Sequence, residues 1–155
     1  MASSRYTQKK KRPRGAGQAA VEFVLTFFAI LFLIFWTFEL IMLLYSYNVF
    51  ADAAKEGVRY AIVHGAGNSA SSGPSTGTAS DCTTNMSAVQ NVVKTYAKTS
   101  FHDISGMTVT VCYLDGTNQS PNRVRVTASY PYVPYIRLGW APPTIHAAAE
   151  GRIVY

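Results

Sequence analysis

The most extended pattern in the chain is an apolar segment near its N-terminus. Phe23–Phe38 contains no charged residue, Glu39 interrupts the pattern, and Leu40–Tyr45 continues it. At about 1.5 Å per residue, residues 23–45 form about 34 Å of helix, and the hydrocarbon core of a bilayer measures roughly 30 Å. The segment is apolar on all sides, as contact with lipid requires. We therefore predict a transmembrane helix over about 23–45; the alternative is a buried core helix of a soluble protein.

The helical pattern continues beyond this segment. Apolar residues between Phe50 and Ala61 keep a period of about 3.6 residues, and no proline occurs between residues 14 and 74. We therefore predict one long helix over residues 18–63, about half of which extends beyond a membrane. Its later charged residues alternate in sign at the spacing of helical neighbours, which indicates a solvated face: Asp52, Lys55, Glu56 and Arg59.

The rest of the chain predicts a linker and a small head. Residues 64–80 are rich in Gly, Ser and Thr, as flexible linkers are. Within residues 81–155, helical spacing around residues 86–96 predicts one helix, and alternation at 107–114 and 123–130 predicts strands, with a further strand at the C-terminus. The predicted fold class is α+β: a long N-terminal transmembrane helix followed by a small head with one helix and an antiparallel sheet of about three strands.

Tyrosine and proline alternate after the second of these predicted strands. Tyr130, Tyr132 and Tyr135 lie in the sequence SYPYVPY. This segment fits either an adhesive aromatic edge or a loop that packs on the sheet. We favour the packed loop.

The chain contains two cysteines, Cys82 and Cys112. One precedes the predicted head helix and the other lies on the first long strand. Both fall on the predicted outer side of the membrane, where an oxidising compartment favours a disulfide that a small head needs. We predict that they form a disulfide; the alternative is a pair of buried free thiols.

Basic residues are concentrated at the N-terminus. Six of the 14 Lys and Arg residues lie within residues 1–14, whereas residues 18–155 contain eight basic and eight acidic residues. Positive charge before an apolar segment predicts a cytoplasmic N-terminus and an extracytoplasmic head. The neutral remainder offers no basic surface for a phosphate backbone, so we predict that the chain binds no nucleic acid.

The sequence lacks the common patterns for catalysis and metal binding. His64, His102 and His146 are scattered and have no metal-ligand spacing. No Gly-rich phosphate loop follows a strand, and no G-x-S-x-G turn occurs. Asp103 and Asp115 lie near predicted turns, which explains them without a catalytic role. We predict no enzyme activity, no catalytic residue, no cofactor and no metal site.

A short motif at the start of the long helix resembles the processing site of type IV prepilins. The sequence GQAAVEF, residues 17–23, follows a basic leader over residues 1–17 and precedes the apolar segment. The resemblance implies that prepilin peptidase cuts after Gly17, because this glycine, and not Gly15, places Glu22 fifth in the mature chain. The implied processing site consists of Gly17, Gln18, Glu22 and Phe23.

The resemblance extends further along the helix. The sequences FEL and NVFADAAKEGVRYAIV are similar to those of TadE-like proteins of the tight-adherence (Tad, Flp-type) pilus system. This resemblance implies a minor pilin or pseudopilin, with a pilin-like helix, that acts in assembly or as a component of the pilus in adhesion or secretion. It implies a single-pass protein of the inner (cytoplasmic) membrane that is later incorporated into a cell-surface pilus. The implied partners are prepilin peptidase, other pilin subunits, the Tad inner-membrane assembly platform and membrane lipid.

Two glutamates have an implied role in helix pairing. Glu22 would pair with the terminal amine of Gln18 in a neighbouring subunit, since a carboxylate in an apolar bundle is tolerated when it is paired. The alternative is a solvated position in the headgroup layer. Glu39 would pair with a basic group of another subunit or contact assembly machinery. The alternative is that its side chain extends to the outer interface.

Two other functions remain open from the sequence. The first is an uncleaved, single-pass envelope protein whose extracytoplasmic head binds a partner. The second is an exported soluble module that signal peptidase releases near Ala53.

Overall fold

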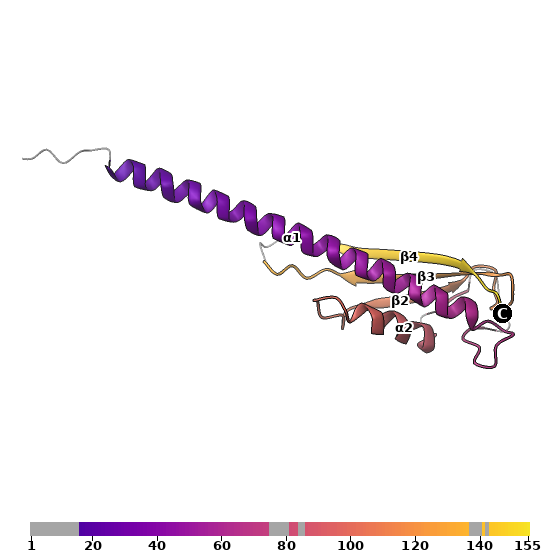
Figure 1. The fold of residues 1–155 in the computed structure, drawn as a ribbon. Helices are drawn as coiled ribbons and strands as arrows, with labels where there is room; N and C mark the ends of the chain where they lie inside the picture. The colour runs from indigo at the N-terminus through magenta and orange to yellow at the C-terminus, as the bar shows by residue number, and fades with distance from the viewer. Residues whose placement is uncertain (1–15, 75–80, 84–85, 137–140, 142) are drawn as a thin grey trace, which may run out of the picture. The chain divides into compact units, whose positions relative to one another are not determined.

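The structure, a computed structural model, describes residues 16–74, 81–83, 86–136, 141 and 143–155. The chain divides into two compact units, Met1–Phe38 and Glu39–Tyr155. The helices are α1 (Ala16–Val63) and α2 (Ser87–Ala97), and the strands are β1 (Asp81–Thr83), β2 (Thr108–Tyr113), β3 (Arg123–Pro131) and β4 (Thr144–Arg152) (Figure 1).

The described part of the first unit is helical and apolar. Its large side chains are exposed, for example Phe23 (71%), Leu25 (65%) and Leu33 (65%). By length and composition, Gly17–Val63 is the one helix among the described residues that is able to cross a membrane, and its most apolar window has no buried residue. The predicted long N-terminal helix and its candidate membrane anchor are therefore present in the structure.

The second unit contains an antiparallel sheet in the order β1-β2-β3-β4. Along β3 the buried residues Val124, Val126, Ala128 and Tyr130 alternate with more exposed ones, as the sequence predicted. The α+β fold class and the three longer strands are confirmed. The sheet gains a fourth strand, β1, which has three residues and is too short for alternation to reveal.

A disulfide joins β1 to its neighbour. Cys82 and Cys112 are direct partners in the β1–β2 register, and their sulfur atoms are bonded. The predicted pairing is therefore present, and the alternative of two free thiols does not apply.

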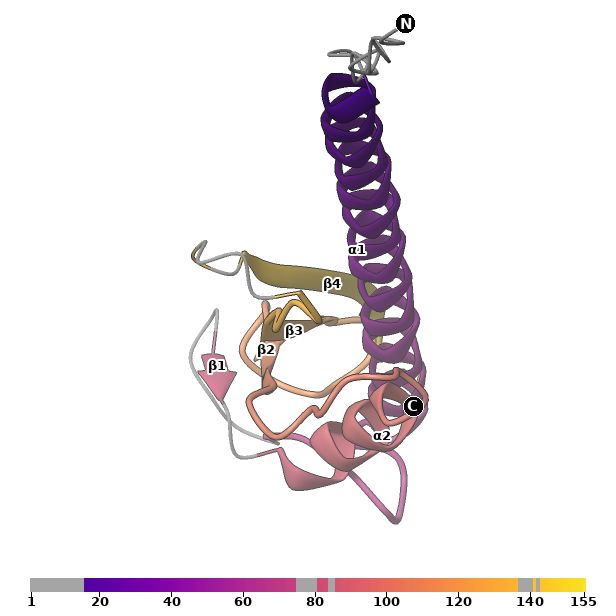
Figure 2. The ribbon, with the colours of Figure 1, turned by 90° about the vertical axis from the view of Figure 1, so that its left-hand side faces the viewer.

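The core of the second unit lies where the later part of α1, α2 and the sheet meet (Figures 1 and 2). Phe50, Val93 and Val126 represent the three elements and are fully buried. Gly57 marks the point of closest approach, because a Cβ atom there would lie 2.4 Å from Val93 Cγ2 and 3.2 Å from Val126 Cγ1. Ala53 is also fully buried, so release of the head by a cut near Ala53 would divide its own core.

The outer face of α1 in this unit is polar. Lys55 Nζ lies 2.9 Å from Asp52 Oδ1, and Arg59 Nη1 lies 2.6 Å from Glu56 Oε1. Both pairs have the i,i+3 spacing of helical neighbours, and both are largely exposed. The predicted solvated face is confirmed.

The described part of the predicted linker, residues 64–74, packs on the head. The Ala66 N–H donates to Asn118 O (2.9 Å), and Asn118 Nδ2 donates to Ser71 Oγ (2.6 Å). The Tyr113 hydroxyl donates to the carbonyl of Ser72, and burial raises the pKa of Tyr113 to about 12. Residues 75–80 lie outside the described residues, and the division into leader, helix, linker and head stays a prediction.

Candidate functional site

The residues of the predicted processing site lie in the first turns of α1. Gln18 Nε2 donates a hydrogen bond to Glu22 Oε1 at 3.1 Å, and both residues are exposed. The Phe23 ring is 71% exposed and stacks on Phe27, with 6.4 Å between ring centroids. A Cβ atom at Gly17 would have no atom within 4 Å. The carboxylate of Glu22 thus has one neutral donor from its own helix and remains accessible to other molecules.

The second predicted pairing residue, Glu39, lies in the second unit and has partners within it. Its Oε1 accepts a hydrogen bond from the Tyr132 hydroxyl at 2.6 Å and one from the Tyr135 N–H at 3.3 Å. Its Oε2 accepts from the Ile136 N–H at 3.3 Å. We expected Glu39 to find its partners in other molecules or to extend to the outer interface. In the structure, three donors come from the segment that follows β3, residues 132–136, which we call the Glu39 clamp.

Prolines and a backbone bond position this clamp. Pro131 ends β3, and the Tyr132 N–H donates to Pro143 O at 3.0 Å, which holds the start of the segment. The Tyr132 side chain is 1% exposed. Burial first, and then its hydrogen bond to Glu39, raise the pKa of the Tyr132 hydroxyl. Tyr132 therefore stays protonated at neutral pH and acts as a donor to the carboxylate.

His102 packs beside the clamp. Its Nδ1 lies 3.1 Å from Ser46 Oγ, and the Ser46 hydroxyl donates to Met42 O at 2.9 Å. Because the Ser46 hydroxyl hydrogen is used in the bond to Met42 O, Ser46 Oγ accepts a hydrogen bond from His102 Nδ1. We therefore assign the proton of the neutral imidazole to Nδ1. The imidazole ring lies 4.9 Å from the Tyr132 ring and 4.7 Å from the Tyr135 ring. Burial lowers the pKa of His102, so the ring is neutral at neutral pH.

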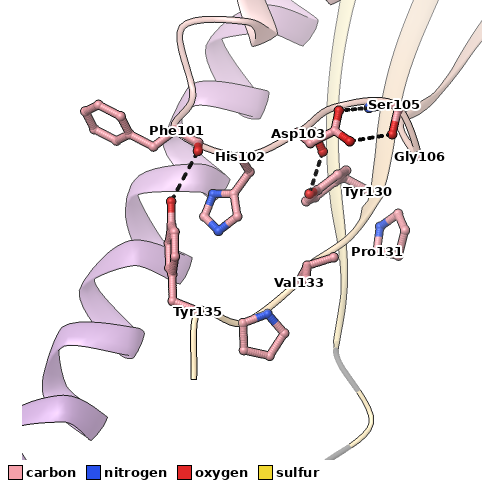
Figure 3. Close-up of a pocket in the computed structure, with 10 residues that line it drawn as sticks. Phe101, His102, Asp103, Ser105, Gly106, Tyr130, Pro131, Val133 and Tyr135 are labelled. Atoms are coloured by element: carbon pink, nitrogen blue, oxygen red, sulfur yellow. Dashed lines mark hydrogen bonds between the residues drawn. The ribbon is translucent and has the colours of Figure 1, made fainter. Parts of the chain in front are cut away.

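An open pocket of about 480 Å³ lies next to His102 (Figure 3). Its polar groups bond to one another: Tyr135 Oη donates to Phe101 O (3.2 Å), and Tyr130 Oη donates to Asp103 O (2.8 Å). The Asp103 carboxylate accepts from the N–H (3.0 Å) and the hydroxyl (2.8 Å) of Ser105, and these bonds lower its pKa. The Ser105 hydroxyl is thus bonded to a carboxylate, but the lowered pKa makes that carboxylate a weaker base than a free aspartate. These hydrogen bonds hold the loop that contains both residues.

The other predicted candidates for chemistry lie apart. His64 Nδ1 lies 2.8 Å from Tyr60 O, and His146 Nδ1 lies 2.9 Å from Ser129 Oγ. Among the residues that the structure describes, no group of three His, Cys, Asp or Glu side chains is placed to hold a metal ion. The Asp115 carboxylate binds Arg123 through Oδ1 at 2.9 Å, and its pKa is lowered by that contact.

Together these features define a class of protein: a long N-terminal helix with a candidate membrane anchor, followed by a small disulfide-closed α+β head. Residues 17–59 match the sequence model of the TadE-like protein family. The resemblance predicted from the sequence is confirmed over that segment, which begins at Gly17 and includes Glu22, Glu39 and the block from residue 48 to Arg59. No curated protein and no solved structure matches the chain.

The sequence did not reveal the residues that hold Glu39. Tyr132 and Ile136 lie 93 and 97 positions away along the chain, and His102 and Ser46 had no motif. The sequence did contain one indication of this contact, since an acid within an apolar helix needs a partner and the tyrosine-rich segment has hydroxyl donors. Which of these donors reach Glu39 depends on how the strands pair.

Proposed function

We propose that this protein is a minor pilin or pseudopilin of a Tad/Flp-type pilus. Prepilin peptidase cuts it after Gly17, and the apolar part of α1 holds it in the inner membrane before assembly. The N-terminus faces the cytoplasm and the head faces outward. The protein acts by helix packing and not by catalysis, together with other pilin subunits and the Tad assembly platform.

The observation that carries this proposal is the match to the TadE-like family, which begins at Gly17. The local structure supports the same position. Gly17 lies in the first turn of α1, and no close neighbour among the described residues requires a glycine there. A peptidase that recognises glycine before the cut accounts for this residue in the proposal.

Glu22 supplies the assembly contact in this proposal. After the cut, Gln18 carries a free α-amine, and Glu22 is the fifth residue of the mature chain. Inside a bundle of apolar helices, a lone carboxylate is costly, whereas a carboxylate paired with a neighbour's amine is tolerated. In the single chain, the Glu22 carboxylate accepts a hydrogen bond from the neutral side-chain amide of Gln18 at 3.1 Å, and the stronger charged pair replaces this bond.

Cleavage is tested with two glycine variants. Gly17→Val is expected to keep the leader, because the residue before the cut is changed. Gly15→Val is the matched control, and its mature chain is expected to begin at Gln18. The readout is the N-terminal peptide of the membrane-associated protein by mass spectrometry. Cleavage of both variants after position 17 would contradict the assignment of Gly17 as the processing glycine.

Assembly is tested with two glutamate variants of the same helix. Glu22→Gln is expected to be cleaved normally but to be depleted at least severalfold from sheared pili. Glu56→Gln removes an exposed acid whose partner is Arg59, and its incorporation is expected to be unchanged. Equal incorporation of both variants would remove Glu22 from the assembly contact.

The open pocket next to His102 supports one alternative, an uncleaved membrane-anchored envelope protein whose head binds a partner. A wild-type chain that keeps residues 1–17 in cells with active prepilin peptidase would favour it.

A further inference from the structure

One group of exposed apolar side chains of the second unit lies around the start of its part of α1. On α1 they are Leu40, Ile41 and Leu44, with exposed fractions of 48%, 57% and 60%. Between residues 48 and 62, all of which the structure describes, α1 exposes no large apolar side chain and presents the charged face already described. The change from apolar to polar surface therefore occurs within the first turns after Glu39.

Loops of the head reach this same end. The Phe101 ring is 72% exposed and stacks on Tyr45 of α1, with 5.3 Å between centroids. Val133 and Tyr135 are 44% and 49% exposed, and the Tyr135 N–H binds Glu39. We call Tyr45, Phe101, Val133 and Tyr135 the rim.

The clamp limits how deep this end lies in a membrane. Glu39 binds backbone N–H groups of an irregular segment, and irregular backbone exposed to lipid does not occur within the hydrocarbon core. Residues 18–38 form about 31 Å of helix, close to the roughly 30 Å of a bilayer core. Residues 18–38 therefore suffice to span it, and Glu22, four residues after Gln18, lies about 6 Å from its inner edge. The continuation of apolar character to Tyr45 then needs another explanation.

We propose that the membrane span ends at Phe38 and that the rim, with the exposed apolar face of Leu40, Ile41 and Leu44, rests in the outer lipid interface. This inference rests on the proposed membrane anchoring of α1. Tyrosine and other aromatic residues favour the interface because one part of the side chain is apolar and another is polar. Segments at an interface are immersed by about 5–10 Å, which is the rise of four to six helical residues after Phe38.

Lipid is the occupant that these observations favour over a second protein chain. The rim continues directly from the membrane anchor, since Phe38 and Glu39 are consecutive residues. Within the second unit, the Glu39 clamp holds Tyr135 of the rim against α1. A second copy of the chain is the competing occupant, and the test distinguishes it.

The test uses spin labels on the full chain in vesicles of phosphatidylethanolamine and phosphatidylglycerol, without reductant so that the disulfide stays closed. Labels are attached to Phe101→Cys, to Val154→Cys as a matched control, and to Ile30→Cys as a membrane reference. Phe101, Val154 and Ile30 are all exposed, at 72%, 58% and 54%. Val154 is a suitable control because its N–H binds Ile62 O, near the other end of the helix.

Collisions with oxygen, which concentrates in lipid, are compared with collisions with a water-soluble nickel chelate. The expected oxygen-to-nickel ratio is highest at position 30, intermediate at 101 and severalfold lower at 154. A label at Val133→Cys is expected to match the one at 101, which guards against a local effect of a single substitution.

The contrary outcomes are distinct. Equal ratios at 101 and 154, with position 30 in lipid, would overturn the interfacial rim and leave the membrane anchor intact. A water-exposed label at position 30 would overturn the anchor itself. A label at 101 that is shielded from both reagents and broadened by a second label would assign the rim to a second copy of the chain and overturn the lipid assignment.

Discussion

The two parts of α1 have the same secondary structure and opposite surroundings. Before Glu39, apolar side chains are exposed on every side of the helix. After residue 48, the buried residues Phe50, Ala54 and Ala61 lie on one face, and charged side chains occupy the other. The apolar face of the later part is buried against other elements of the same chain. Among the described residues of the earlier part, most large apolar side chains are exposed, and such a surface suits contact with lipid or with other apolar helices.

The two parts of α1 have different roles in the molecule. The later part of α1 is a structural element of the head, since it lies in the same core as α2 and the sheet. The earlier part is the candidate membrane anchor and, in the function that we propose, the assembly surface. Glu39 lies at this change, and three donors of the head hold its carboxylate.

The most severe test of this comparison substitutes one phenylalanine in each part. Phe50 is fully buried and packs on Tyr130 with 5.1 Å between ring centroids, whereas Phe28 is 61% exposed. Phe50→Ala is expected to lower the free energy of unfolding of the head by about 3–5 kcal/mol. Phe28→Ala is expected to change it by less than about 0.5 kcal/mol. Urea unfolding in detergent measures both, and equal effects would contradict the division of the helix.

Opening the disulfide is expected to have the next largest effect. Cys82 and Cys112 are 30 residues apart, for which the chain-entropy model gives about 3–4 kcal/mol. The double variant C82S/C112S should lose about this much stability in the head. The helical circular dichroism of the anchor should persist in detergent, because that part contains no cysteine. Loss of both signals together would show that the anchor depends on the head.

Removal of the Tyr132 hydroxyl should weaken the Glu39 clamp. Hydrogen bonds to charged groups contribute about 1.5–3 kcal/mol, and Tyr132 donates the shortest of the three bonds to Glu39. Tyr132→Phe is expected to destabilise the head by about that amount. Tyr135→Phe is the matched control, because its hydroxyl binds the Phe101 carbonyl at an exposed site. Equal small effects would show that the clamp does not hold the helix to the head.

The smallest expected effect is a pH dependence from His102. Burial lowers its pKa from 6.5 and outweighs the opposite effects of the Glu39 carboxylate and the Val133 carbonyl. The folded head therefore favours the neutral ring, which also faces the hydroxyl-bearing rings of Tyr130, Tyr132 and Tyr135. This contribution to stability is fully present above pH 6.5 and is lost as the pH falls through the lowered pKa of the folded state.

His102→Asn tests this linkage, since its amide is able to replace the Nδ1 donor to Ser46. Its stability is expected to change less between pH 8 and pH 5 than that of the wild type. His146→Asn alters an exposed histidine bound to Ser129 and should retain the wild-type profile. An unchanged profile in His102→Asn would exclude His102 as the source.

The helix and the long strands were predictable because their residues repeat with a fixed period. Phe50 to Ala61 revealed the buried face of α1, and the alternation from Arg123 to Tyr130 revealed β3. β1 was not predictable, since three residues carry no period and its place depends on pairing with β2. Composition predicted a linker over residues 64–80, but it could not show that Gly65 is buried against the C-terminal segment.

The candidate sites also differ in how far the sequence predicts them. The motif around Gly17 and Glu22 is local and was readable from the sequence. Glu39 stood out as an acid among apolar residues, but the three groups that bind it come from more than 90 positions away. Such contacts follow from strand register and not from local pattern.

In the function that we propose, the chain is processed as a prepilin, and the N-terminal residue of the protein in cells shows whether it is. The protein is isolated from membranes of cells with and without prepilin peptidase, and its intact mass and N-terminal peptide are determined. We predict a chain that begins at Gln18 when the peptidase is present and a chain that keeps residues 1–17 when it is absent. A chain that retains Lys9 to Arg14 in cells with active peptidase would contradict it.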